Sequence, residues 1–219
     1  ASAVLFKEKL QRMGINVYTH TATPGYPSNI DLVVSPEGYG KNEYIPVEAP
    51  VVVVNAPGPG SGKLATCLNQ MYHEARMGET PHYSKLETFP IWNLPLDHPV
   101  NIAYEAATAD LGDVNLIDHF HLQAYGKVTV NYNRDLEAYP LLKKIIERIN
   151  NSQCPYKSPT DMGVNRCGFG ITDDEICREA GRQEIIRRYF KIRTDYASGL
   201  CDDETVSRII AIMDKAQLV

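Results

Sequence analysis

Apolar runs alternate along the chain with polar breaks rich in glycine and proline, and the spacing within each run predicts its structure. Apolar residues recur at helical spacing in residues 2–13 and again in residues 63–76. Shorter apolar stretches at residues 15–20, 30–34 and 51–54 lack that spacing and predict strands. Because the predicted helices and strands alternate, this pattern indicates an α/β fold with a layered, mostly parallel sheet.

The second half of the chain becomes helical. A strand is predicted at residues 128–132 and is followed by an amphipathic helix, but beyond a polar break near Asn151 the apolar spacing is helical. We therefore expect an α/β domain over residues 1–150. A helical C-terminal subdomain over residues 151–219 would lead into a further domain outside this chain.

The segment at residues 51–63 carries the strongest functional signal. Four valines predict a buried strand, a run of glycine and proline ends it, and Lys63 opens the next predicted helix. Glycines expose backbone amides, a helix N-terminus adds positive partial charge, and a lysine adds a full charge, so this order of elements suits phosphate. The expected ligand-binding residues of this Walker-A-like strand, loop and helix are Gly58, Gly60, Ser61, Gly62 and Lys63.

The match to a Walker A loop is incomplete at two positions. Pro57 replaces the first glycine, and Leu64 replaces the serine or threonine that meets magnesium. Thr66 lies about 200° around the helix from Leu64, so its hydroxyl is no simple substitute. ATP or another nucleotide, with or without magnesium, is the expected cofactor, and a tight structural turn with a solvated lysine is the alternative.

Candidate catalytic groups follow from the phosphate interpretation. Phosphoryl transfer needs an acid that positions the metal and a group that orients the substrate. Asp110 and Arg134 are our choices, because Asp110 lies in an acidic stretch and Arg134 follows a predicted strand. The same stretch contains His119 and His121, and a metal-dependent hydrolase centred on His121 is an alternative. A solvated acidic face is the simpler explanation of the stretch.

The composition of the chain argues against some classes of binding partner and indicates the cellular compartment. The net charge is −5 and no run of lysine or arginine occurs, which argues against a nucleic-acid or membrane-surface protein. No apolar stretch approaches a membrane span and no signal peptide is visible, so we expect a cytoplasmic protein. Five cysteines form no C-x-x-C pair, which fits a reducing compartment. Self-association into a homo-oligomer stays open.

Seven segments together resemble an uncharacterised bacterial family, domain-of-unknown-function family 1846. They are GYP (25–27), EGYGKN (37–42), APGPGSGK (56–63), ETFPIWN (87–93), EAATADL (105–111), NYNRD (131–135) and SPTDMGVN (158–165). The resemblance extends from about Gly14 to Tyr189. It implies that the chain is the central portion of a longer protein, lacking an N-terminal α/β part and a C-terminal domain, but it carries no established reaction.

These observations rank three functions. The leading hypothesis is binding of a nucleotide or another small phosphorylated ligand, with phosphoryl transfer or hydrolysis as the reaction. The second is a non-catalytic assembly module whose glycine-rich loop is only a tight turn, and the third is the metal-dependent hydrolase.

Overall fold

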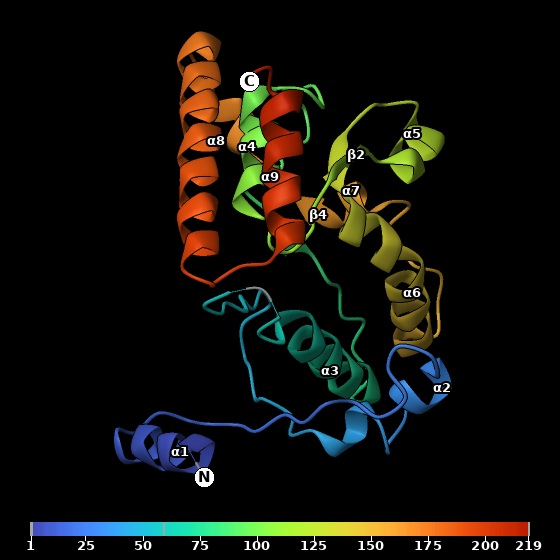
Figure 1. Cartoon of the computed structure of the whole chain (residues 1–219). Helices are drawn as coiled ribbons and strands as arrows, with labels where there is room; N and C mark the ends of the chain where they lie inside the picture. The colour runs from blue at the N-terminus through green and yellow to red at the C-terminus, as the bar shows by residue number, and fades with distance from the viewer. Residues whose placement is uncertain (1, 59, 219) are drawn as a thin grey trace. The chain divides into compact units, whose positions relative to one another are not determined.

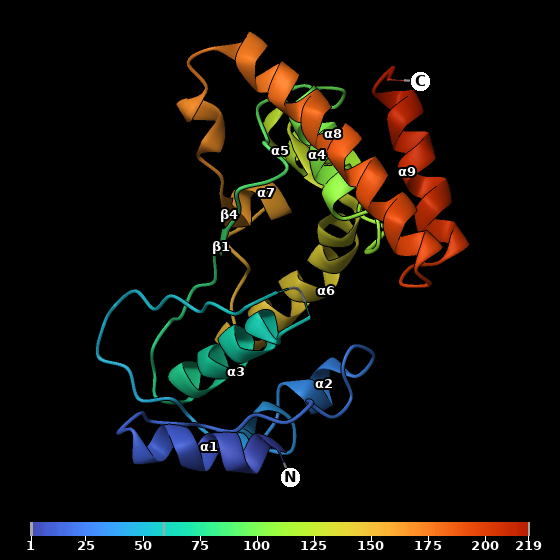
Figure 2. The same cartoon turned by 60° about the vertical axis from the view of Figure 1, so that its left-hand side comes forward.

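A computed structural model describes residues 2–58 and 60–218 and divides the chain into two compact units. Unit 1 comprises residues 1–83 and 141–154, and unit 2 comprises residues 84–140 and 155–219. Figures 1 and 2 show helices and a few short strands, so the mixed α/β class is confirmed. The expected division at residue 150 falls inside the second segment of unit 1 and stays a prediction for the longer protein.

Unit 1 is built from helices joined by extended loops. Its elements are α1 (Ser2–Arg12), α2 (Ile30–Val33), the 3-10 helix η1 (Tyr39–Lys41), α3 (Lys63–Arg76) and the second half of α6 (Asn133–Asn150). The Tyr39 and Tyr72 rings lie 6.1 Å apart and pack η1 on α3. The side chain of Gln70 bonds both the N–H and the C=O of Ile45, which ties the loop after η1 to α3.

Unit 2 holds the strands and the largest helices. In chain order it contains β1 (Lys85–Leu86), α4 (Pro99–Ala107), β2 (Asn115–Ile117), α5 (His119–Tyr125), β3 (Val130–Tyr132), the first half of α6, α7 (Pro159–Met162), β4 (Gly163–Val164), the 3-10 helix η2 (Cys167–Gly170), α8 (Asp174–Ala197) and α9 (Asp203–Lys215).

The core of unit 2 lies between α4, α8 and α9, which pack side by side in both views (Figures 1 and 2). Asp173 and Asp202 begin the two long helices by accepting from backbone amides of the first turn. Gly181 lets α8 approach α4, since a Cβ there would lie 2.7 Å from the carbonyl carbon of Pro99. The buried core side chains are Ile102, Ala103, Ala106, Ala109, Ile185, Ile192, Val206, Ile209, Ile212 and Met213.

Two small sheets position the polar groups of unit 2. β1 pairs in parallel with β4, and β2 pairs antiparallel with β3, so that Asn115 lies opposite Tyr132. Gly163 is required in β4, because a Cβ there would lie 2.5 Å from the ring of Trp92. The predicted strand at residues 128–132 is therefore confirmed in outline by β3.

Two other predicted strands are wrong, and a third is not seen among the described residues. Residues 15–20 form no regular element, and residues 30–33 form the short helix α2. The Asn29 side chain accepts a hydrogen bond from the Leu32 amide at 3.0 Å and caps this helix. That local bond outweighs the strand preference of a short apolar run.

The third of these predicted strands, the one before the glycine-rich loop, is not seen among the described residues. Residues 51–54 form no strand, and Val51 and Val53 are 77% and 81% exposed. A strand needs neighbours for its backbone groups, and the described residues supply none here. The expected layered, mostly parallel sheet is likewise not seen among the described residues, where each sheet has two strands.

No helix among the described residues is both long enough and apolar enough to cross a lipid bilayer.

Candidate functional site

The glycine loop, residues 55–63, leads directly into α3 in unit 1. Lys63 is the first residue of α3, as the sequence predicts, and Gly62 precedes it in the left-handed region with φ 85°. The ammonium Nζ of Lys63 turns back and donates to the carbonyl oxygen of Gly58 at 2.8 Å. Ser61 Oγ also donates to this carbonyl and accepts from the Gly58 amide at 3.3 Å. Three of the five predicted residues, Gly58, Ser61 and Lys63, are thus joined by hydrogen bonds.

The space above the glycine loop is open. A Cβ built on Gly58, Gly60 or Gly62 would meet no atom within 4 Å. Left-handed φ values of 69° and 85° explain the glycines at positions 60 and 62. Gly58 has no left-handed φ, and no described atom lies within 4 Å of the position that a Cβ would take. Packing within unit 1 therefore gives no reason for glycine at position 58.

The start of α3 leaves backbone donors exposed. No acceptor among the described residues takes a hydrogen bond from the amides of residues 60–65, and the first amide with a partner belongs to Thr66. Gly62 provides no side-chain cap. The N-terminus of α3 therefore combines N–H groups that lack an acceptor among the described residues, positive partial charge and the Lys63 ammonium.

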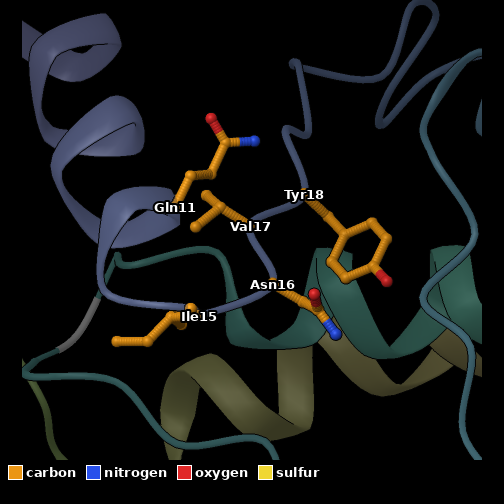
Figure 3. Close-up of a pocket in the computed structure, with 6 residues that line it drawn as sticks. Gln11, Ile15, Asn16, Val17 and Tyr18 are labelled. Carbon is orange, nitrogen blue, oxygen red and sulfur yellow. The ribbon is translucent and has the colours of Figure 1, made fainter.

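Unit 1 also has a shallow hollow of about 360 Å³ where α1 ends (Figure 3). Figure 3 shows Ile15, Asn16, Val17 and Tyr18 on the stretch after the helix. No side chain that lines the hollow carries a charge. It therefore offers no group for binding phosphate or for acid–base chemistry.

Unit 2 contains an ionic cluster that sequence reasoning missed: Lys85, Glu87, Tyr132 and Asp135. The ammonium Nζ of Lys85 lies 2.7 Å from Glu87 Oε1, donates to the Tyr132 hydroxyl at 2.8 Å, and donates to Asp135 Oδ1. The side chain of Glu87 is 10% exposed, and its Oε2 has no partner among the described residues. Lys85 lies in β1 and Glu87 follows it two positions later, so both side chains point to the same face. This spacing was the only local sequence signal for the cluster.

Burial and charge oppose each other in the ionic cluster. Burial raises the pKa of Glu87, and the nearby Lys85 charge offsets only part of this effect. Burial lowers the pKa of Lys85, but the carboxylates of Glu87 and Asp135 raise it, and the net shift is upward. Burial also raises the pKa of Tyr132, so this phenol stays protonated. Lys85 is therefore a cation already neutralised by two acids.

Arg134, predicted to orient a substrate, pairs with a carboxylate. Its Nε and Nη2 both donate to buried Asp113, the second at 2.8 Å, and the Tyr104 hydroxyl donates to the same carboxylate at 3.0 Å. Its guanidinium lies 5.6 Å from the Tyr132 ring centroid, and 45% of its side chain remains exposed. Arg134 therefore keeps a free side, while its charge is balanced.

Asp110, predicted to hold magnesium, lies in the exposed turn after α4. Its carboxylate takes no hydrogen bond and no ion pair among the described residues. Throughout residues 2–58 and 60–218, no three histidine, cysteine, aspartate or glutamate side chains are grouped so as to hold a metal. Asp110 and Arg134 belong to unit 2, whereas the glycine loop belongs to unit 1.

His121, the residue predicted for a metal-dependent hydrolase, contacts a buried serine. Its Nδ1 lies 2.9 Å from Ser158 Oγ, and this hydroxyl accepts from the Asp161 amide and caps α7. Asp118 caps α5 and accepts from the Thr160 hydroxyl at 2.6 Å. Both Ser158 and Asp118 are fully buried, so no substrate reaches them. This serine–histidine pair joins α5 to α7 and does not form an accessible nucleophile.

Comparison with known proteins identifies the family. The model described as "Domain of unknown function DUF1846, N-terminal" matches residues 1–217, and the chain belongs to this family. The match begins at the first residue and bears an N-terminal description, so the expected central position is not supported.

Three curated relatives give the extent of the similarity. The chain is similar to a UPF0371 protein of Fusobacterium nucleatum, with 64% identity over 97% of this chain and 42% of the relative. Similar proteins of Clostridium botulinum and Clostridium tetani are 60% and 61% identical over 99% of this chain and 43% of each relative. The chain thus spans less than half the length of these relatives.

Proposed function

We propose that the chain binds a nucleotide or another small phosphorylated molecule at the glycine loop. The observation that carries this proposal is the open space above Gly58, where packing and backbone conformation give no reason for glycine. Close approach of a ligand to the backbone would supply that reason. The expected Walker-A-like strand, loop and helix are part of the proposal, and the start of α3 at Lys63 supports it.

The groups around the loop suit phosphate oxygens. Backbone amides at the start of α3 have no acceptor among the described residues, and the helix adds positive partial charge. Lys63 binds a neutral carbonyl, so it can exchange this acceptor for an anionic oxygen by rotation of its own side chain. Ser61 adds a hydroxyl at the same carbonyl.

The proposal also includes a reaction at the bound phosphate. Phosphoryl transfer or hydrolysis would require a metal-positioning acid and a group that orients the substrate. Asp110 and Arg134, both in unit 2, stay the residues predicted for these two roles. Leu64 supplies no hydroxyl for magnesium, so phosphate itself should bind without the metal.

A panel of ATP, a sugar phosphate and pyrophosphate, each with and without magnesium, tests the proposal by thermal shift. A ligand at 100 times its Kd stabilises the fold by about 2.7 kcal/mol. Lys63→Ala removes a charge-assisted contact of roughly 1.5–3 kcal/mol, so affinity should fall about 10- to 100-fold. Lys144→Ala removes the same charge from an exposed position of α6 and should leave binding unchanged. Absence of any shift throughout the panel would contradict the proposal.

A second candidate, the non-catalytic assembly module, is favoured by the exposed apolar side chains of unit 1. It predicts no response to phosphates and no difference between the two lysine variants.

A further inference from the structure

Unit 1 leaves apolar side chains exposed at two places. Val51, Val52 and Val53 are 77%, 49% and 81% exposed in an extended stretch. Helix α1 buries none of its residues, although Val4, Leu5 and Phe6 follow one another along it. Scattered exposed apolar residues are ordinary, but runs of this kind mark surfaces that another element covers.

The backbone of the valine segment, residues 51–54, is also unpaired. None of its amides or carbonyls forms a hydrogen bond with the described residues. The segment is bounded by Pro50 and Pro57, which limit it to the length of a short strand. β-Branched residues in succession, with no polar residue between them, are typical of a strand buried on both faces within a parallel sheet.

One buried polar side chain of unit 1 lacks hydrogen-bond partners among the described residues. Asn69 of α3 is 1% exposed, and neither its Oδ1 nor its Nδ2 has a partner among the described residues. Buried amides are almost always paired in complete domains. Because unit 1 itself encloses this side chain, the missing partner is a feature of unit 1 and does not bear on the valine segment.

We infer that the valine segment is an inner strand of a sheet whose other strands come from the same polypeptide, outside residues 1–219. The relatives support this source, because more than half of their length lies outside the region that matches. A second copy of the chain fits less well, since its equivalent segment would pair with one edge and leave the valine faces uncovered. The inference concerns the sheet and is independent of phosphate binding.

Hydrogen exchange tests the inference on two proteins, the 219-residue chain and the full-length polypeptide that contains it. In the chain alone, the amides of residues 51–54 should exchange at nearly the unstructured rate. In the full-length polypeptide they should be slowed by about 100-fold or more, as sheet amides are. Fast exchange in both proteins would overturn the inference. Protection in the chain alone that rises with its concentration would also overturn it, because a second copy would then be the partner.

A matched pair of substitutions gives a second readout. Val53→Asn should lower the Tm of the full-length polypeptide by about 4 °C or more and leave the Tm of the chain alone within about 1 °C. Val128→Asn, at another exposed valine, is the control for loss of the same side chain. An equal effect of Val53→Asn on both proteins would contradict burial by the additional strands.

Discussion

Two lysines, one in each unit, have opposite surroundings. Lys85 of unit 2 contacts the carboxylates of Glu87 and Asp135 and the Tyr132 hydroxyl. Lys63 of unit 1 donates to a carbonyl, and no carboxylate among the described residues lies within ion-pair distance of it. A lysine between two acids is neutralised and holds its own fold together. A lysine on a carbonyl keeps its charge for an incoming anion, so the comparison distinguishes a structural cation from a ligand-binding one.

Replacing the two lysines should have very different effects on stability. Lys85→Met leaves two largely buried carboxylates without their cation and should lower the free energy of unfolding by about 3 kcal/mol. Lys63→Met removes one hydrogen bond at the surface and should cost less than about 1 kcal/mol. Urea unfolding followed by the fluorescence of Trp92, the single tryptophan, measures the first effect beside β1. Equal losses from the two variants would refute the distinction.

The glycines of the loop should also divide into two classes. Gly62→Ala forces a side chain into a left-handed conformation and should cost about 1–2 kcal/mol. Gly58→Ala has room for its methyl group and should change stability by no more than about 0.5 kcal/mol. Thermal unfolding of both variants measures the difference. A large loss for Gly58→Ala would show that packing, and not a ligand, explains this glycine.

The ionic cluster should show its own pH dependence. Because burial raises the pKa of Glu87 in the folded protein, the folded state holds this proton more tightly than the unfolded state. Stability should therefore fall as pH rises from the ordinary pKa of glutamate, about 4.3, through the folded value. Glu87→Gln should remove this decline. If the free energy of unfolding of the variant depends on pH as that of the wild type does, Glu87 is not the group responsible for the decline.

A partly buried carboxylate gives the opposite dependence on pH and the smallest expected effect. Hydrogen bonds from Arg187 and then from Arg188 lower the pKa of Glu184 on α8 to about 2. The stabilisation is present above the unfolded pKa of about 4.3 and is lost as pH falls towards 2. Glu184→Gln should cost about 0.5 kcal/mol at pH 7 and almost nothing at pH 2. A cost independent of pH would argue against an ionic origin.

The elements that the sequence predicted correctly are those whose sequence signals are local. Helices α3, α8 and α9 have long apolar spacing and defined first residues, such as Asp173 and Asp202 at the caps of α8 and α9. The valine segment fails because a strand depends on neighbours, and its neighbours are not among the described residues. The short helix α2 could have been predicted from the Asn29 cap and Asp31 in its first turn.

The candidate sites also differ in whether the sequence could predict them. The glycine loop is a contiguous segment, so its residues and the start of α3 at Lys63 were predictable. The ionic cluster joins Lys85 to Asp135, fifty positions further along the chain, and periodicity does not reveal such a contact. The bond of Arg134 to Asp113, twenty-one positions earlier, was hidden for the same reason.

Calorimetric titration of Gly58→Ala tests the central claim, that the open backbone of the glycine loop binds phosphate. The ligands are ATP and pyrophosphate without magnesium, and the wild-type chain and Lys144→Ala are the references. If a phosphate group lies against the backbone at position 58, the added methyl group should weaken binding by about tenfold or more, about 1.4 kcal/mol, while the fold remains as stable as the wild type. Equal affinity of Gly58→Ala and wild type, or no binding by either, would contradict the claim.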